Sequence, residues 1–115
     1  MFKKLRTVIY HADDLEKAKE WYISVTGVYP YFDEEFYVGF DIDGCELGID
    51  PDMSLVKEGN TSVAYWGVDD IEACVEKLKQ VNATIINDVN EVGGGIKVAV
   101  VNDPWGNAVG LIEGA

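Results

Sequence analysis

Two short stretches of the chain carry the same helical pattern of apolar side chains. In each, the apolar positions recur at i, i+3, i+7 and i+10, and the second stretch lies 56 positions after the first. This spacing places the apolar side chains on one face of a helix. The stripes consist of Leu15, Ala18, Tyr22 and Val25, and of Ile71, Cys74, Leu78 and Val81. The pattern predicts one amphipathic helix in each half of the chain and indicates an internal repeat.

Both predicted helices begin with the same polar signal. Asp13 and Asp69 stand where a carboxylate can accept hydrogen bonds from the first amides of a helix. Glu16 and Glu72, each three residues later, complete a capping-box pattern. At the other ends, Gly27 and Asn82 are predicted to terminate the helices as C-caps.

Short β-rich runs surround the two helices. Strands are predicted over residues 6–11, 31–33, 36–42 and 45–50 in the first half, and over 62–68, 84–89, 96–102 and 108–113 in the second. Asp43-Gly44, the glycines at 93–95 and the segment 103–107 supply residues that tolerate the backbone angles of tight turns. Residues 51–60, which are polar and contain a proline and a glycine, are the predicted linker between halves.

Each half therefore consists of a strand, a helix and three strands. One helix covers only one face of a four-stranded sheet, so the opposite face of each sheet needs a partner. We expect an α+β protein of two tandem βαβββ units, about residues 1–52 and 60–115, forming one domain over 1–115. The mixed sheet of this domain should curl into a cup with the helices outside.

Charge narrows the range of partners. Among 115 residues, 48% are hydrophobic and 26% charged, and 9 basic against 21 acidic residues give a net charge of −12. This balance opposes binding to nucleic acid or to an anionic membrane and suits a cationic ligand, although solubility is the commoner reason for an acidic surface. No apolar run approaches the roughly 18 residues of a membrane span, so we expect a cytoplasmic protein. Cys45 and Cys74 are predicted to be buried structural thiols.

Three features together resemble the vicinal oxygen chelate superfamily, which includes glyoxalases, dioxygenases and bleomycin-resistance proteins. They are the duplicated unit, the segment 13–22 (Asp-Asp-Leu-Glu-Lys-Ala-Lys-Glu-Trp-Tyr) with Gly27 after it, and the segment 103–107 (Asp-Pro-Trp-Gly-Asn). The resemblance covers nearly the whole chain and implies the cup-shaped fold, with homodimers common. It says little about the substrate, because one scaffold supports many reactions.

The resemblance also implies where a metal would bind. In metal-dependent members, the first and last strands of each unit supply the ligands, which corresponds here to Thr7, Val63, Gly48 and Gly110. None of these is a good ligand for a catalytic divalent cation. We therefore predict no metal and no other cofactor. His11, Glu46 and Asp50 share strand parity with these positions and are the nearest replacement donors.

Strand alternation predicts which side chains line the cup. The expected lining is Thr7, Ile9, His11, Glu46, Gly48 and Asp50 from the first unit and Val63, Tyr65, Gly67, Ala108, Gly110 and Ile112 from the second. Glycines at the ligand positions predict a roomy, apolar floor. Tyr37 and Trp105 could add an aromatic wall for a planar or cationic ligand, although hairpin capping or a dimer contact is the more common role of such rings.

Two functions from different classes follow. The first is a metal-independent binding protein that sequesters a small organic, cationic ligand on Thr7, Ile9, Tyr37, Gly48, Val63, Tyr65, Trp105 and Gly110. The alternative is a glyoxalase-like lyase or isomerase in which His11, Glu46 and Asp50 transfer protons; His11 is the only histidine and titrates near neutral pH in ordinary surroundings. A partner-binding domain with an unused cup ranks last, because an apolar floor is costly to expose.

Overall fold

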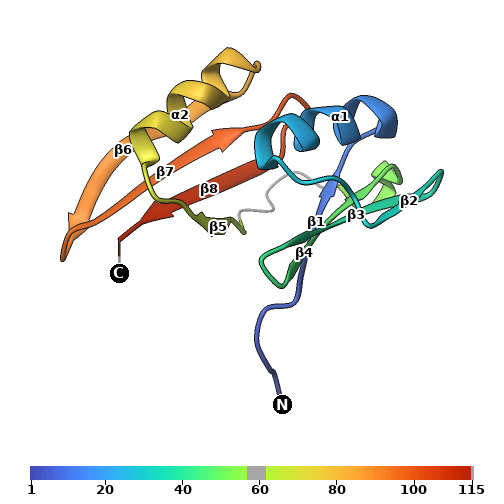
Figure 1. Ribbon diagram of the computed structural model, residues 1–115, viewed down its shortest axis with the longest axis horizontal. Helices are drawn as coiled ribbons and strands as arrows, with labels where there is room; N and C mark the ends of the chain where they lie inside the picture. Colours follow the sequence, from blue (N-terminus) through green and yellow to red (C-terminus); the bar gives the residue numbers. More distant parts are fainter. Residues whose placement is uncertain (57–61, 115) are drawn as a thin grey trace. The chain divides into compact units, whose positions relative to one another are not determined.

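The computed structural model describes residues 1–56 and 62–114. The chain divides into two compact units, Met1–Glu58 and Gly59–Ala115. Both units contain a four-stranded sheet and one α-helix, in the order expected from the repeat (Figure 1). The prediction of an α+β fold built from tandem βαβββ units is confirmed.

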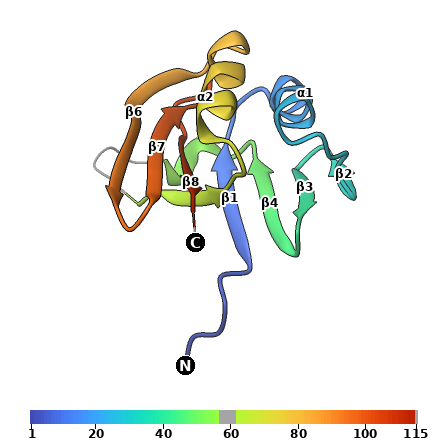
Figure 2. The same ribbon diagram turned by 60° about the vertical axis from the view of Figure 1, so that its left-hand side comes forward.

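The first unit forms a mixed sheet with the strand order β1-β4-β3-β2. β1 and β4 are parallel, whereas the other neighbouring strands are antiparallel. The elements are β1 (Thr7–His11), α1 (Leu15–Thr26), β2 (Phe32–Glu34), β3 (Tyr37–Ile42), β4 (Cys45–Asp50) and the 3-10 helix η1 (Met53–Leu55). α1 packs on β3 and β4 and covers one face of the sheet (Figure 2).

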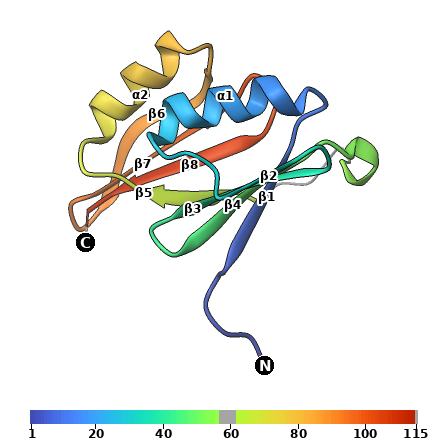
Figure 3. The same cartoon turned by 45° about the vertical axis from the view of Figure 1, so that its right-hand side comes forward.

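The second unit repeats this topology with the strand order β5-β8-β7-β6, and β5 and β8 form its parallel pair. Its elements are β5 (Ala64–Gly67), α2 (Ile71–Gln80), β6 (Thr84–Gly93), β7 (Ile96–Asn102) and β8 (Ala108–Glu113). α2 packs on β6, β7 and β8 (Figure 3). Neither α-helix of the described residues is long and apolar enough to cross a membrane.

Alternate strand residues build the core beneath each helix. In the first unit, Tyr10 of β1 stacks on Tyr22 of α1 with ring centroids 5.7 Å apart. Burial of such side chains is the main driving force for folding. The other buried apolar residues of this unit include Ala18, Val38, Phe40, Leu47 and Ile49, and those of the second unit include Ile71, Val75, Leu78, Ala99, Val101, Val109 and Leu111. The stripes read from the sequence therefore lie on the buried faces of the helices.

The helix caps lie one residue later than predicted. Asp14 and Asp70, not Asp13 and Asp69, accept hydrogen bonds from Lys17 N and Ala73 N, each at 3.1 Å. The prediction was wrong because either aspartate of an Asp-Asp pair can supply the cap, and the sequence does not say which one turns inward. Gly27 ends α1 in the left-handed region with φ 73°, as predicted. α2 ends at Gln80 with Val81 as its C-cap, and Asn82 takes the left-handed conformation directly after the cap, with φ 71°.

Several further boundaries differ from the expected ones. β6 continues to Gly93 through irregular pairing with β7, whereas alternation had indicated a shorter strand. β5 begins at Ala64, so Val63 precedes the strand. The expected linker contains η1, and its positions 57–60 lie outside the described residues. Cys45 and Cys74 are free but only half-buried, which corrects the expectation of buried thiols.

The turn between β7 and β8 is organised by a buried carboxylate. Asp103 is 3% exposed, and it accepts hydrogen bonds from Trp105 N, Asn107 N and Asn107 Nδ2. Hydrogen bonds offset the cost of burying this charge. Gly106 supplies the positive φ of 87° that the predicted turn requires.

Candidate functional site

The face of the first sheet opposite α1 collects most of the predicted site residues of that unit. Parallel pairing of β1 with β4 sets Thr7 beside Glu46, Ile9 beside Gly48 and His11 beside Asp50. Ile9 is 47% exposed, whereas its neighbour Tyr10 on the helix side is 5% exposed. The alternation expected from strand geometry thus places these six residues on the open face.

The floor at Gly48 is occupied by an aromatic side chain. A Cβ atom added to Gly48 would overlap the hydroxyl of Tyr37, and it would lie 2.8 Å from Tyr37 Cε1. Gly39, which pairs with Gly48 across β3 and β4, has the ring of Tyr31 in the corresponding place, 3.3 Å from a Cβ. The prediction of a roomy floor at Gly48 is therefore wrong, because the missing side chain makes room for the ring of Tyr37.

Glu46 joins these two tyrosines. Tyr37 Oη donates to Glu46 Oε2 at 2.5 Å, and Tyr31 Oη donates to Oε1. The two hydrogen bonds, that of Tyr31 first, hold the pKa of Glu46 below its ordinary value. The bond to Glu46 raises the pKa of Tyr31, while burial and then the same carboxylate raise that of Tyr37. The carboxylate is thus kept charged and both phenols are kept protonated.

A hollow of about 460 Å³ opens beside this cluster and is lined by Arg6, Tyr31, Asp41, Gly44 and Glu46. Its volume falls in the range of small-molecule sites, roughly 300–1,000 Å³. Asp41 pairs with Glu46 across neighbouring strands, so two carboxylates and one guanidinium face the same space. Sequence reasoning found Glu46 and Tyr37 but missed Arg6, Tyr31 and Asp41. The available signal was the pair of glycines on β3 and β4, Gly39 and Gly48. Two neighbouring glycines leave a gap on the sheet surface that large side chains must cover.

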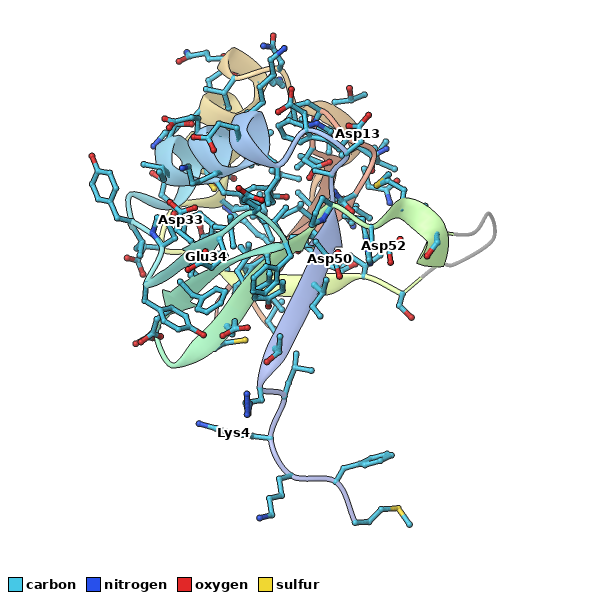
Figure 4. The ribbon with its side chains drawn as sticks, turned by 90° about the vertical axis from the view of Figure 1, so that its right-hand side faces the viewer. Lys4, Asp13, Asp33, Glu34, Asp50 and Asp52 are labelled. Atoms are coloured by element: carbon cyan, nitrogen blue, oxygen red, sulfur yellow. The ribbon has the colours of Figure 1, made fainter. Side chains whose placement is uncertain are left out.

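His11 and Asp50 form a separate group at the far end of β1 and β4. His11 Nδ1 lies 3.0 Å from the carbonyl oxygen of Asp52, and Asp50 Oδ1 accepts from Asp52 N at 2.8 Å. Figure 4 shows Asp50 and Asp52 near one another on this side of the unit. Hydrogen bonds from Ser54 lower the pKa of Asp52. Glu46 and Asp50 are four residues apart on one strand, or about 13 Å, so the three predicted catalytic residues do not converge.

The second unit also places a tyrosine ring against a glycine, and no hydrogen bond from this ring to a carboxylate is found among its described residues. Tyr65 pairs with Gly110, and a Cβ on Gly110 would lie 2.7 Å from Tyr65 Cδ2 and 2.8 Å from the carbonyl oxygen of Ala64. Val63 is half-buried before β5, and Trp105 is half-buried in the turn before β8. The expectation that both open faces line one cup stays a prediction.

The residues at the four expected ligand positions do not fit a catalytic metal. Thr7 offers a hydroxyl, Val63 offers no donor, and the space above Gly48 and Gly110 holds tyrosine rings. Another acidic cluster exists among the described residues: ligand atoms of Asp70, Glu72 and Glu113 lie within 4.8 Å of one another. These carboxylates accept from Ala73 N, Lys97 Nζ and Ile71 N, which accounts for them as caps and as an ion pair at the start of α2.

Comparisons with known proteins agree with this architecture. A family model described as the glyoxalase/bleomycin resistance protein/dioxygenase superfamily matches residues 4–111. No curated protein matches the chain.

Three solved structures illustrate the similarity of fold. An enzyme of that family from Burkholderia phytofirmans is 18% identical, with 96% of this chain and 98% of that chain covered and a TM-score of 0.82. The fosfomycin resistance protein FosX from Listeria monocytogenes is 15% identical, with 100% and 96% covered and a TM-score of 0.80. A lactoylglutathione lyase from Agrobacterium tumefaciens is 18% identical, with 96% and 93% covered and a TM-score of 0.76.

Gly48→Ala tests the packing of the Tyr37 ring against Gly48. We expect a loss of about 1–3 kcal/mol in the free energy of unfolding, because the added methyl group displaces the ring. Urea unfolding measures this loss. Gly48→Ala should cost less stability in a Tyr37→Ala background than in the unmodified protein, because no tyrosine ring then lies above position 48. Gly67→Ala is the matched control, since a Cβ there meets no atom within 4 Å. Equal effects at Gly48 and Gly67 would contradict this packing.

Glu46→Gln tests the shared carboxylate. The hydrogen bond to Glu46 is the largest cause of the raised pKa of Tyr31, whereas burial is the largest cause of the raised pKa of Tyr37. The substitution should therefore lower the pKa of Tyr31 more than that of Tyr37, as followed by NMR titration of the tyrosine Cζ atoms. Asp41→Asn is the control, because Asp41 is only the last cause at Tyr31.

The same cluster makes stability depend on pH at both extremes. The raised phenol pKa values contribute stability below pH 10, the ordinary tyrosine value, and that stability is lost as pH rises through the folded-state values. The lowered pKa of Glu46 contributes stability above the ordinary carboxyl range, and this is lost as pH falls through the folded-state value. Glu46→Gln should make the free energy of unfolding depend less on pH at both the acid and the alkaline end. An unchanged loss of stability at alkaline pH would contradict the hydrogen bonds between Glu46 and the tyrosines.

Proposed function

Because the chain belongs to the glyoxalase/bleomycin resistance protein/dioxygenase superfamily, we propose that it is a metal-independent binding protein for a small organic cation. The observation that carries the proposal is the Glu46 carboxylate, held by Tyr31 and Tyr37 beside an open hollow. A fixed, ionised carboxylate next to aromatic rings favours a cationic group that also presents a flat apolar part.

The charges that line the hollow support this choice of ligand. Asp41 and Glu46 contribute two negative charges and Arg6 one positive charge, so the lining carries a net negative charge at neutral pH. The charge of the whole chain, −12, has the same sign and attracts cations over longer distances. The rings supply contact area with little loss of conformational freedom, since a phenol has few rotatable bonds.

The remaining predicted ligand residues divide between the two units. Ile9 and Thr7 share the open face with the tyrosine cluster. Val63, Tyr65, Trp105 and Gly110 belong to the second unit, and we propose that they complete the binding site if both faces line a common cup. A cytoplasmic location and a homodimer remain part of the proposal.

Benzamidine and benzamide test the preference for a cation, because they share a ring and differ in charge. Isothermal titration should show tighter binding of benzamidine, by about tenfold for one charge-assisted contact. The difference should shrink in high salt and vanish in Glu46→Gln. Glu20→Gln, which removes an exposed carboxylate from α1, should retain it.

Two results would overturn the proposal. One is equal binding of the two probes to the unmodified protein. The other is a stoichiometric content of Zn, Ni, Mn or Fe in protein purified without chelator, since the proposed site contains no metal-binding set.

A second candidate, a glyoxalase-like lyase or isomerase, is favoured by the geometry of His11. A carbonyl oxygen only accepts hydrogen bonds, so the contact with Asp52 O places a proton on Nδ1. The imidazole so oriented lies beside Asp50 on the paired strands, and these two side chains are the candidates for transfer of a carbon-bound proton.

Proton–deuterium exchange tests this candidate. If the enzyme function holds, the protein exchanges the carbon-bound proton of the hemithioacetal of a 2-oxoaldehyde, and NMR detects the exchange. His11→Ala should abolish the exchange, whereas Glu46→Gln, at the other end of the strand, should leave it in place. Absence of exchange with the unmodified protein would remove the candidate while leaving cation binding untouched.

A further inference from the structure

The residues before β1 form an extended arm of mixed basic and apolar character. Residues 1–6 read Met-Phe-Lys-Lys-Leu-Arg and contain three of the nine basic residues of the chain. Phe2 is 94% exposed and Leu5 is 71% exposed. The arm leaves the start of β1 and runs away from the sheet of its own unit (Figure 3). Its last residue is anchored, because Glu46 N donates to Arg6 O at 2.8 Å.

The opposite edge of the same sheet has the complementary character. Residues 29–36 read Tyr-Pro-Tyr-Phe-Asp-Glu-Glu-Phe and include the edge strand β2. Tyr29 is 78% exposed and Phe36 is 66% exposed, and the rings of Phe32 and Phe36 meet edge to face at 5.9 Å. We call Tyr29, Phe32, Glu34, Glu35 and Phe36 the β2 patch. An exposed group of aromatic side chains of this kind marks an interaction surface.

We propose that the arm of one copy of this chain docks on the β2 patch of a second copy. The two lysines and three apolar side chains of residues 1–5 match the two carboxylates and three aromatic rings of the β2 patch. Among the described residues, Asp33 already pairs with Lys19 at 3.1 Å, whereas no ion pair involves Glu34, Glu35, Lys3 or Lys4. The unpaired backbone edge of β2 can also accept the arm as an added strand.

The topology favours a second copy over the arm's own chain. β1 and β2 are the two outermost strands of the order β1-β4-β3-β2. Figure 4 shows Lys4 on the arm, well away from Asp33 and Glu34 on β2. In a twofold-symmetric pair each copy would supply one arm and one patch, so the contact forms twice and the assembly closes.

Charge reversal on each side tests the docking. The arm variant is Lys3→Glu with Lys4→Glu, and the patch variant is Glu34→Lys with Glu35→Lys. Sedimentation velocity over a concentration series should show that the unmodified protein dimerises and that salt weakens the dimer. Each variant alone should dimerise about tenfold or more weakly, because exposed ion pairs become like-charge contacts. An equimolar mixture of the two variants should associate again, since both of its contacts pair opposite charges.

Matched reversals elsewhere control for net charge. Lys17→Glu with Lys77→Glu, and Asp88→Lys with Glu91→Lys, should dimerise as the unmodified protein does. Circular dichroism checks that every variant is folded. The proposal is overturned if the unmodified protein is monomeric at all concentrations. A monomer whose arm is protected from hydrogen exchange would show that the arm docks on the β2 patch of its own chain, which also overturns the proposal. It is also overturned if the variants dimerise normally alone, or if their mixture fails to associate.

Discussion

One carboxylate bound by two phenols, above a pair of glycines, determines the chemistry of the first unit. Gly39 and Gly48 face each other on neighbouring strands, and their missing side chains let the rings of Tyr31 and Tyr37 lie against the sheet. With the rings in place, both hydroxyls reach Glu46. The hydrogen bonds favour the ionised form of the carboxylate, so the glycines act on function indirectly, by allowing the cluster that fixes a negative charge beside the hollow.

Most of the fold could be predicted because its determinants are local and repeated. β7 and β8 have the bounds expected from alternation, and Asp43-Gly44 forms the expected turn with φ values of 51° and 90°. The errors arose where neighbouring residues offered equivalent choices. Asp13 and Asp14 can both cap α1, and the end of β6 depends on irregular pairing with β7 that no local pattern records.

The candidate site was predicted less well, because it depends on what fills the space above a residue. Strand parity correctly placed Glu46, Gly48 and Asp50 on the open face. Parity does not measure distance along the strand, so it grouped His11 and Asp50 with Glu46, although the hydrogen bonds divide them into two clusters. A glycine in the sequence also does not show whether the space above it is empty or filled by a ring from another part of the chain. For this reason the sequence did not indicate the role of Tyr31.

Gly48 and Gly110, which are aligned in the two units, are required for different reasons. The difference indicates which unit carries the candidate site. At Gly48 the three atoms nearest to an added Cβ all belong to the side chain of Tyr37, which can move, whereas at Gly110 the backbone oxygen of Ala64 is also in the way. Gly110 is therefore required by the closeness of the main chain, and Gly48 by a ring that carries a hydroxyl to Glu46. Among the described residues, only the first unit combines the seated ring with a bound carboxylate, so the duplicated fold supplies two similar faces and the acid at position 46 distinguishes them.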